Sequence, residues 1–446
     1  MRAQIKGLLE TIALLYKNLF FILILSKNSD IIPYMPYCGG METYMNIAIL
    51  GFGVVGRGVA DLLSDNLSEC KRLGGGEINI KYILDLRDFP GTPYESLVVH
   101  DFSVIENDGE VDCIIEVMGG SHPAYEYTLA ALRAGKHVIT SNKEVVANYG
   151  EEFLRAAAEN GVSYRFEAAV GGGIPVIAPL CDFMKQNKIS EVRGILNGTT
   201  NYILTRMFTY SDSFETALAD AQKRGYAERN PDADILGTDA ARKIAILGAI
   251  CSEKMIPTDE IHTEGIVNIR ENDVSLAKLA GYSIKLLGRY VSAENGAFVF
   301  VAPHLIPEDS LFTAVNGVYN AVEVVGEPIG NVVFYGKGAG AGATASAVVG
   351  DLMQAMRRGA VGQAVSFEKS CDYGLDFSEF SSKSFVVTDA SPEAVAEIFG
   401  KVRLIPSDNE TAFITESAMT EPEFAEKEQE LTDDGARVLS RIRVLQ

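Results

Sequence analysis

The fold of this chain is decided by the stretch Ala48-Ile49-Leu50-Gly51-Phe52-Gly53-Val54-Val55-Gly56-Arg57-Gly58. The pattern predicts an apolar strand over residues 46–50 and a helix over residues 58–67, with a G-x-G-x-x-G turn between them. In such a turn the first glycine allows the tight bend, the second lets the backbone approach a pyrophosphate, and the third lets the helix pack on the strand. The free N–H groups at the helix start favour a phosphate. We therefore predict a dinucleotide cradle, with an ordinary glycine turn as the alternative.

Length and composition limit the classes of protein that remain. A chain of 446 residues, 47% hydrophobic and 22% charged, predicts two or three globular domains. The net charge of −21 disfavours a nucleic-acid partner, because phosphate backbones require a basic surface. The 6 cysteines and 5 histidines lack metal-ligand spacing, so we expect reduced cysteines, a cytoplasmic location and no structural zinc.

The N-terminal segment, residues 1–44, differs from the rest of the chain. Its apolar run Leu19–Leu25 is far shorter than a membrane span, so no membrane partner is expected. A secretory signal is disfavoured, because Pro33 and Pro36 follow where a small-residue cleavage site would stand. We interpret the segment as an extension outside the fold, whose translation the sequence leaves open, and a peripheral membrane anchor is the alternative.

Strands alternate with helices as far as residue 175. The pattern predicts strands over 78–84, 111–117, 137–140 and 162–167, and helices over 124–134 and 144–160. This alternation is typical of a doubly wound parallel sheet, so residues 45–175 are predicted to form a Rossmann-type NAD(P)-binding domain. Asp85 and Arg87 follow the second strand. An acid there favours the ribose hydroxyl of NAD and an arginine the 2′-phosphate of NADP, so the preference stays open.

The remaining chain predicts two further units and a return to the first. Residues 176–321 carry helices and mixed strands, which we assign to an α+β catalytic and dimerisation domain. Residues 322–360 are predicted to complete the first domain, since the glycine-rich stretch 336–342 opens a helix suited to close ligand approach; a hinge is the alternative. Residues 380–446 read β-α-β-β-α-β, a small ferredoxin-like domain. The predicted fold class is therefore α/β, with a Rossmann-type domain, an α+β domain and this tail.

Two lysines are candidates for chemistry. Lys143 directly follows a predicted strand, at the sheet edge where ligands bind in open α/β folds. Lys243 follows Asp239 by one helical turn and precedes a strongly apolar run, which predicts a partly buried ammonium group with an altered pKa. An ordinary surface ion pair is the alternative. The loop at 225–234 adds several acids, which suit binding of an ammonium group or a solvated surface.

Several separated motifs resemble those of homoserine dehydrogenases, from about residue 45 to the end. The matching segments are Gly51–Gly58, Thr140–Lys143, Glu167–Pro175, Gly194–Leu204, Gly225–Glu228 and Gly237–Lys243. The resemblance implies reversible NAD(P)-dependent reduction of L-aspartate 4-semialdehyde to L-homoserine, in threonine, methionine and isoleucine biosynthesis. It implies that Lys243 is the acid or base on the reacting oxygen and that Asp239 orients the substrate. Lys143 would lie between cofactor and substrate, and Glu228 with Asp234 would recognise homoserine.

The resemblance also implies cofactor and cation ligands. Cofactor contacts are expected in the glycine turn, after the second strand, at the sheet edge that carries Lys143, and in the glycine-rich stretch 336–342. The expected residues are Phe52, Gly53, Val54, Val55, Arg87, Lys143 and Gly340. A loop resembling the family's monovalent-cation site would bind sodium through backbone carbonyls, with hard oxygen ligands at Glu167, Val170, Gly172 and Ile174.

The tail resembles an ACT domain, an amino-acid-sensing module. Threonine is therefore an expected effector, although Asp389-Ala-Ser-Pro392 lacks the glycine that often follows proline in such domains. We also expect a homodimer or homotetramer. A related dehydrogenase on another small aldehyde or amino acid, or a sensor that binds NAD(P) and an amino acid without turnover, are the competing interpretations.

Overall fold

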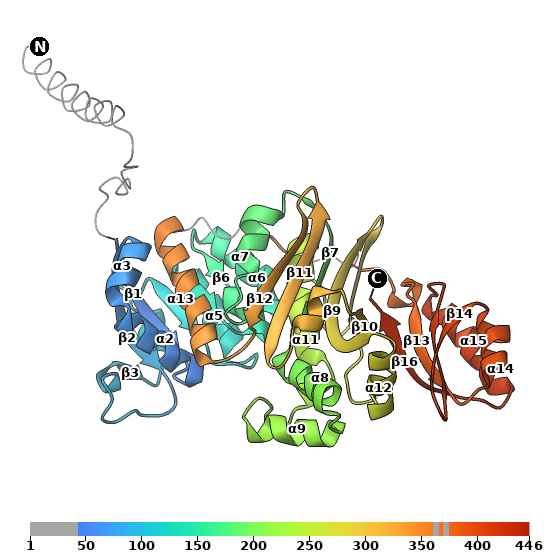
Figure 1. The fold of residues 1–446 in the computed structure, drawn as a ribbon. Coiled ribbons are helices and arrows are strands. Elements are labelled where there is room, and N and C mark those ends of the chain that lie inside the picture. Colours follow the sequence, from blue (N-terminus) through green and yellow to red (C-terminus); the bar gives the residue numbers. More distant parts are fainter. Residues whose placement is uncertain (1–42, 360–364, 369–373, 446) are drawn as a thin grey trace, which may run out of the picture. The chain divides into compact units, whose positions relative to one another are not determined.

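The computed structural model describes residues 43–359, 365–368 and 374–445 (Figure 1). The predicted extension, residues 1–44, lies outside these residues except for its end, which begins the first strand. Among the helices of the described residues, none is long and apolar enough to span a bilayer.

The first sheet is parallel and has the strand order β3-β2-β1-β4-β5-β6. Its strands are β1 (Thr43–Leu50), β2 (Gly76–Leu84), β3 (Val98–Val99), β4 (Cys113–Glu116), β5 (His137–Thr140) and β6 (Tyr164–Arg165). The strand order reverses between β1 and β4, and a ligand crevice lies beyond the carboxyl ends of the strands at such a point. The doubly wound Rossmann-type prediction is confirmed.

Both faces of this sheet are buried beneath helices. Its helices are α2 (Val54–Asp65), α3 (Leu67–Gly74), α4 (Ser103–Glu106), α5 (Ala124–Arg133), α6 (Lys143–Glu159) and, from far along the chain, α13 (Ala341–Arg358). Successive residues of β1 enter different cores: Ile47 and Ile49 join the α2 and α13 side, whereas Ala48 and Leu50 join the other. Burial on both faces explains the continuous apolar runs of the parallel strands.

The first helix begins earlier than the sequence predicts. It starts at Val54 instead of Gly58, and it contains Gly56 and Gly58. Both glycines lie where the helix contacts another part of the chain. A Cβ atom on Gly56 would lie 2.0 Å from the carbonyl oxygen of Gly51, and one on Gly58 would lie 3.3 Å from the Cβ of Ala345 in α13. These glycines are therefore helical contacts and not helix breakers.

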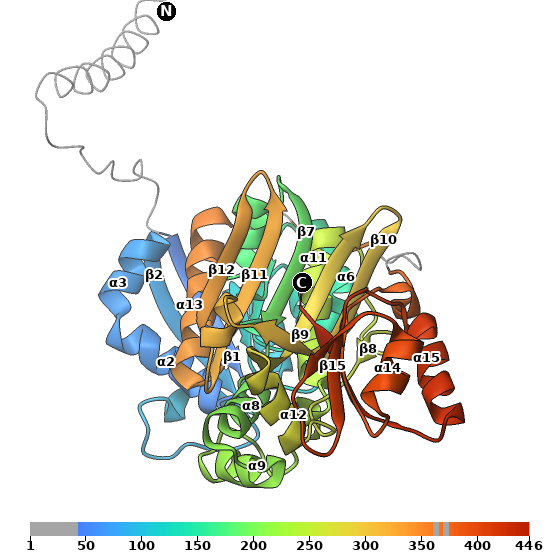
Figure 2. The ribbon, with the colours of Figure 1, turned by 45° about the vertical axis from the view of Figure 1, so that its right-hand side comes forward.

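The second sheet is mixed and has the order β12-β11-β7-β9-β10, with β8 on β10. Its strands are β7 (Lys188–Ile195), β8 (His262–Thr263), β9 (Tyr282–Ala293), β10 (Gly296–Pro307), β11 (Tyr319–Glu327) and β12 (Gly330–Lys337). The accompanying helices are α7 (Ile177–Pro179), the π-helix η4 (Leu180–Met184), α8 (Gly198–Tyr210), α9 (Phe214–Lys223), α10 (Asp232–Ile235), α11 (Thr238–Ser252) and α12 (Glu271–Leu279). Figure 2 shows α8 and α11 against this sheet.

One predicted boundary requires correction. Residues 322–337 belong to the second sheet, because the hairpin β11–β12 pairs with β7 through contacts such as Val322 with Gly194. Only α13, at the end of the predicted 322–360 segment, returns to the first sheet and packs on α2 (Figure 1).

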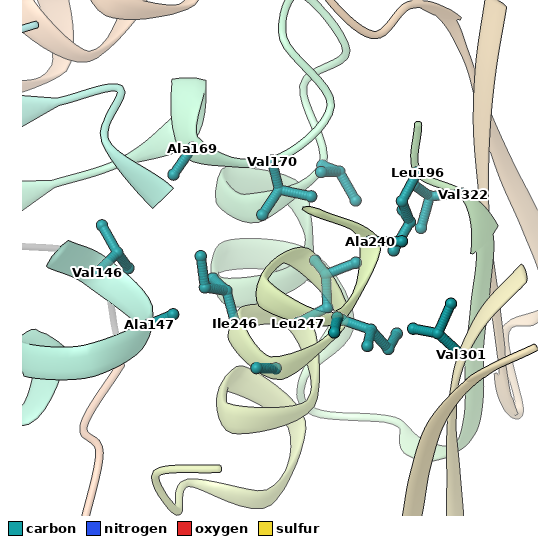
Figure 3. Close-up of a cluster of buried hydrophobic side chains, with 14 of the residues drawn as sticks. Val146, Ala147, Ala169, Val170, Leu196, Ala240, Ile246, Leu247, Val301 and Val322 are labelled. Carbon is teal, nitrogen blue, oxygen red and sulfur yellow. The ribbon is translucent and has the colours of Figure 1, made fainter. Parts of the chain in front are cut away.

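Helix α11 lies between the two sheets. Figure 3 shows Ile246 and Leu247 of this helix between Val146 of α6 on one side and Val301 and Val322 of the second sheet on the other. Because α11 is almost entirely buried, its side chains are fixed relative to both sheets.

The tail has the predicted β-α-β-β-α-β order. Its elements are β13 (Ser384–Thr388), α14 (Pro392–Phe399), β14 (Val402–Ile405), β15 (Thr411–Thr415), α15 (Glu421–Asp433) and β16 (Val438–Val444). Its strands pair antiparallel in the order β16-β13-β15-β14, and β16 also pairs in parallel with β10, His304 opposite Arg443. The second sheet therefore continues into the tail. Short 3-10 turns lie at η2 (Glu95–Leu97), η3 (Glu167–Ala169), η5 (Leu311–Ala314) and η6 (Phe377–Glu379).

Candidate functional site

The glycine turn between β1 and α2 is tightly folded and leaves one position open. Gly51 has a φ of 93°, and its N–H donates to the carbonyl of Leu84 over 2.8 Å. A Cβ on Gly51 would lie 3.0 Å from Cα of Met118, so this turn packs directly on the loop after β4. A Cβ on Gly53, by contrast, would meet no atom within 4 Å. Gly53 therefore presents its backbone to open space at the N-terminus of α2, where a phosphate would be stabilised.

The adenosine end of the predicted cofactor site is organised by Asp85 and Arg87. The Asp85 carboxylate accepts the N–H of Phe52 at 2.8 Å and two guanidinium N–H groups of Arg87 at 2.9 and 3.0 Å. The hydrogen bond from Arg87 lowers the pKa of Asp85 to about 2. The Arg87 side chain is 63% exposed, so its cation faces the surface where a ribose or its phosphate would lie.

The other predicted cofactor residues lie around the same turn. Phe52 is buried with its ring edge-to-face against Phe89, Val54 is exposed at the start of α2, and Val55 is half-buried. Gly340 is the N-cap of α13 and has a φ of 116°. A Cβ on Gly58, in the second turn of α2, would lie 3.4 Å from the carbonyl oxygen of Ala341 at the start of α13, so the first turns of two helices from distant parts of the chain lie close together.

The candidate catalytic residues form a cluster around Asp239. Lys243 Nζ lies 2.6 Å from Asp239 Oδ2, and Lys143 Nζ lies 3.0 Å from Asp239 Oδ1, so one carboxylate bridges two ammonium groups. Lys243 Nζ also donates to the carbonyl of Leu196 at 2.7 Å. Lys143 begins α6 of the first sheet, whereas the other two residues lie on α11. The cluster therefore joins the cofactor-binding part to the second sheet.

Asn197 extends this cluster toward the acidic loop. Its side-chain amide donates to Asp239 Oδ2 at 2.9 Å and to Asp234 Oδ1 at 2.7 Å. Asn197 also caps α8, since its Oδ1 accepts the N–H of Thr200. The sequence reasoning did not name Asn197 as a site residue. The sequence did contain a signal for it: Asn197 is a polar residue between a predicted strand and a predicted helix, a position typical of a helix N-cap.

Burial and charge set the protonation of the cluster. Burial would raise the pKa of Asp239, but the ammonium groups of Lys243 and Lys143 lower it below its usual range. Burial lowers the pKa of Lys243, while Asp239 counteracts that shift. Burial also raises the pKa of Asp234. A buried lysine with a lowered pKa and a fixed anionic partner is suited to move a proton near neutral pH.

Glu228 lies apart from this cluster. Its side chain is exposed on the loop between α9 and α10, where its backbone carbonyl accepts from Gln222 at 3.1 Å. Within the described residues no hydrogen bond or ion pair links its carboxylate to the lysines. The structure brings Lys143, Lys243, Asp239 and Asp234 together, and it leaves Glu228 on the surface side of that loop.

The predicted cation loop has the donor chemistry that a hard cation requires. The Glu167 carboxylate itself is occupied, because it accepts the N–H groups of Val176, Ile177 and Ala178 at 2.6–2.8 Å. Among the hydrogen bonds of the described chain, none ends on the carbonyl oxygens of the other predicted ligands, Val170, Gly172 and Ile174. These residues are buried, and backbone carbonyl oxygens are the type of ligand that a hard cation takes.

The fold and the site define a nicotinamide-dinucleotide-dependent dehydrogenase with a separate catalytic sheet. The family model "Homoserine dehydrogenase, NAD binding domain" matches residues 51–167, and "Homoserine dehydrogenase" matches residues 175–353. The chain belongs to the homoserine dehydrogenase family. It is therefore an NAD(P)-dependent oxidoreductase that acts on the CH–OH group of homoserine in amino-acid biosynthesis.

Individual relatives agree with this assignment. The chain is 38% identical to homoserine dehydrogenase of Bacillus subtilis, over 72% of this chain and 75% of that one. It is 42% identical to that of Synechocystis, over 69% and 72%. Among solved structures, a homoserine dehydrogenase from Thiobacillus denitrificans has a TM-score of 0.83 at 32% identity, over 91% of this chain and 99% of that one. A hyperthermophilic archaeal homoserine dehydrogenase mutant, solved in complex with NADPH, has a TM-score of 0.61 at 27% identity, over 71% and 98%.

Proposed function

We propose that Lys243 exchanges the proton of the reacting oxygen in the interconversion of L-homoserine and L-aspartate 4-semialdehyde. The observation that carries this assignment is the bridge from Lys143 through Asp239 to Lys243, within 3.0 Å at each step. In the reduction, the Lys243 ammonium group polarises the aldehyde and gives its proton to the forming alkoxide; in the oxidation, the neutral amine accepts it. When bound, nicotinamide supplies or accepts the hydride.

Asp239 acts by holding both lysines in place. Without an anion between them, two ammonium groups in one buried site would repel each other. Asp239 therefore keeps Lys243 protonated enough to act as an acid, and it orients the group through a fixed hydrogen bond. Asp234 on α10 and Glu228 on the preceding loop are assigned to the substrate's ammonium group. This role for Glu228 requires its exposed side chain to turn toward the substrate.

The crevice residues are assigned to the dinucleotide. Gly53 and the N-termini of α2 and α13 would hold the pyrophosphate, with Phe52, Val54, Val55 and Gly340 around it. Arg87 would hold the adenosine ribose or its 2′-phosphate, which suits NADP or NAD. The NADPH complex of the archaeal relative supports the phosphorylated form as the first cofactor to test.

The remaining assignments concern ions, assembly and regulation. The buried carbonyls near Gly172, together with that of Glu167, are assigned to a sodium ion, which would fix the loop that leads into α7. Membership in the family supports a homodimer or homotetramer in the cytoplasm. The tail's β-α-β-β-α-β order supports an ACT-like domain with threonine as its effector.

The assignment of Lys243 is tested by steady-state kinetics with homoserine and either NADP or NAD. We expect Lys243→Met to lower kcat by about 10²–10⁴-fold, because it removes the general acid and base while leaving the cofactor crevice intact. Cofactor affinity, measured by calorimetry, should stay within about twofold of the wild type if binding and proton transfer are separable. Equal losses of turnover and cofactor affinity would contradict the proposed role. A matched control, Lys223→Met, removes an exposed cation from the end of α9 and should leave kcat unchanged.

A further inference from the structure

Glu116 is a fully buried carboxylate at the point where the strand order of the first sheet reverses. It is the last residue of β4, directly opposite Leu50 at the end of β1, and its exposure is 0%. Gly51, the first residue of the glycine turn, follows Leu50. Glu116 therefore lies at the carboxyl edge of the sheet, where the cofactor is proposed to bind, although no part of the dehydrogenase mechanism described above uses it.

Its two carboxylate oxygens are held by two different loops. Oε1 accepts the N–H of Met118 at 2.8 Å, and Oε2 accepts the hydroxyl of Thr140 at 2.6 Å. The Glu116 backbone carbonyl accepts the N–H of Ser141 at 3.3 Å. One residue thus connects the loop after β4 with the loop after β5.

Both loops shape the site further. Met118 is the residue against which Gly51 packs, so the contact to Glu116 also fixes the floor of the glycine turn. The Asn142 amide donates to the carbonyl of Gly120 at 2.7 Å, and Asn142 Oδ1 caps α6. Helix α6 begins with Lys143. A change at Glu116 would therefore reach the catalytic lysine pair through hydrogen bonds to backbone.

Within the described residues, Glu116 also has no charged partner. No salt bridge in the described part of the chain includes it, and its hydrogen-bond donors are all neutral. Burial raises the pKa of Glu116, while the Thr140 hydroxyl and the Met118 N–H favour the ionised form. Of the neighbouring cluster, Lys143 and Lys243 balance Asp239 and Asp234 in formal charge. An ionised Glu116 therefore gives the nicotinamide end of the site one excess anion.

This anion lies in the half of the sheet that should hold nicotinamide. A doubly wound sheet binds one mononucleotide on each half, and Asp85 and Arg87 mark the adenosine half at the end of β2. The half formed by β4 to β6, which carries Glu116 and Lys143, remains for nicotinamide. The ring is cationic when oxidised and neutral when reduced, so only its oxidised form is attracted by a nearby anion.

We propose that Glu116 is a positioning residue that fixes the two loops at the nicotinamide end and that its charge favours binding of the oxidised, cationic ring over the reduced one. This inference rests on the proposed placement of the cofactor in the crevice. At an effective dielectric constant of about 20, two unit charges within about 10 Å of each other change a binding constant by about tenfold or more.

The test measures the dissociation constants of oxidised and reduced NADP, and of both forms of NAD, with the intact chain. Calorimetry is the suitable method, because the sequence contains no tryptophan and binding cannot be followed by tryptophan fluorescence. The variants are Glu116→Gln, which removes the charge, and Glu116→Asp, which keeps it. Asp112→Asn is the matched control: Asp112 is a half-buried carboxylate that directly precedes β4, at the end of the strand opposite Glu116, where it accepts the N–H of Asn46 at 2.7 Å.

We expect Glu116→Gln to weaken binding of the oxidised form about tenfold more than binding of the reduced form. Glu116→Asp should keep a ratio close to the wild type, as should Asp112→Asn. A purely structural role would weaken both forms equally, so an unchanged ratio in Glu116→Gln overturns the proposal, as does an equal change in Asp112→Asn.

Two further outcomes are decided by the same measurements. If Glu116→Gln does not fold, Thr140→Val replaces it; losing that hydroxyl destabilises the ionised carboxylate, so we expect a smaller shift of the ratio in the same direction. An unchanged ratio there overturns the proposal. If the wild type binds neither cofactor form, the cofactor placement itself fails, and this inference fails with it. The proposal for Glu116 does not depend on the role of Lys243. If the ratio of dissociation constants shifts in Glu116→Gln while Lys243→Met keeps full turnover, the proposal for Glu116 still holds and the one for Lys243 fails.

Discussion

Replacing Asp239 by asparagine removes the anion between the two lysines while keeping the shape of the side chain. In the wild type its carboxylate contacts both ammonium groups and the Asn197 amide. The variant keeps an oxygen that can accept one of these donors. It leaves Lys143 and Lys243 facing each other without a balancing charge.

The direction of the resulting pKa change follows from the structure. Burial already lowers the pKa of Lys243, and Asp239 counteracts this. The 2.6 Å contact between Lys243 Nζ and Asp239 Oδ2, at an effective dielectric constant of about 20, corresponds to about 6 kcal/mol of attraction. The Leu196 carbonyl remains as an acceptor and water can enter the site, so we expect only part of this attraction to be lost, and the pKa of Lys243 to fall.

Aldehyde reduction needs the protonated lysine, and a lysine is protonated below its pKa. The alkaline limb of the kcat profile for aspartate semialdehyde reduction should therefore move toward acid in Asp239→Asn. Homoserine oxidation needs the neutral amine, so its acidic limb should move in the same direction. The rates are read from the absorbance of the reduced cofactor over a pH series in both directions.

A suitable control is Asp232→Asn, which removes an exposed carboxylate from the same loop region and should leave both limbs in place. The position of a limb is independent of the height of the profile, so a general loss of substrate binding does not imitate the shift. If the limbs of Asp239→Asn coincide with those of the wild type, Asp239 does not set the protonation of Lys243 and the reasoning is refuted.

Three further predictions concern the cofactor crevice and the cation loop. Gly56→Ala should lower the free energy of unfolding by about 3 kcal/mol or more, because the new Cβ would lie 2.0 Å from the Gly51 carbonyl. The Cβ of Gly53→Ala would meet no atom within 4 Å, so this variant should keep the melting temperature of the wild type but bind the cofactor more weakly. Calorimetry and thermal melts of the two variants would separate these effects, and equal melting temperatures would contradict them. Arg87→Gln should weaken NADP binding about tenfold more than NAD binding, since it removes a cation from the ribose corner, and equal losses would exclude a contact to the 2′-phosphate. Exchanging sodium for tetramethylammonium at constant ionic strength should lower turnover, because the bulky ion cannot bind between the buried carbonyls near Gly172. Identical rates in both salts would contradict a role for a sodium ion in turnover.

Local sequence signals were sufficient where one segment determines its own structure. The glycine turn, the strand His137–Thr140 and most elements of the tail lie where the sequence predicts them. The spacing of Asp239 and Lys243 also predicted their contact, since residues four apart share a helical face.

Contacts between distant segments were not accessible from the sequence pattern. The hairpin β11–β12 reads as an ordinary apolar pair of strands, and only its pairing with β7 assigns it to the second sheet. Lys143 and Asp239 meet because α6 and α11 pack together across almost a hundred residues of chain, a result of tertiary packing. Glu116 looks like any polar residue at a strand end, and its importance depends on two loops that converge in space.

The shared sheet formed by β10 and β16 has a consequence for shortened versions of the enzyme. Removing the tail would uncover hydrogen-bonding groups of β10 that now face Arg443 and Val444. An uncovered strand margin of this kind readily recruits strands from other molecules. A catalytic fragment ending before residue 380 would therefore be prone to self-association. Loss of activity in such a fragment would be explained by aggregation and would not show that the tail regulates the enzyme.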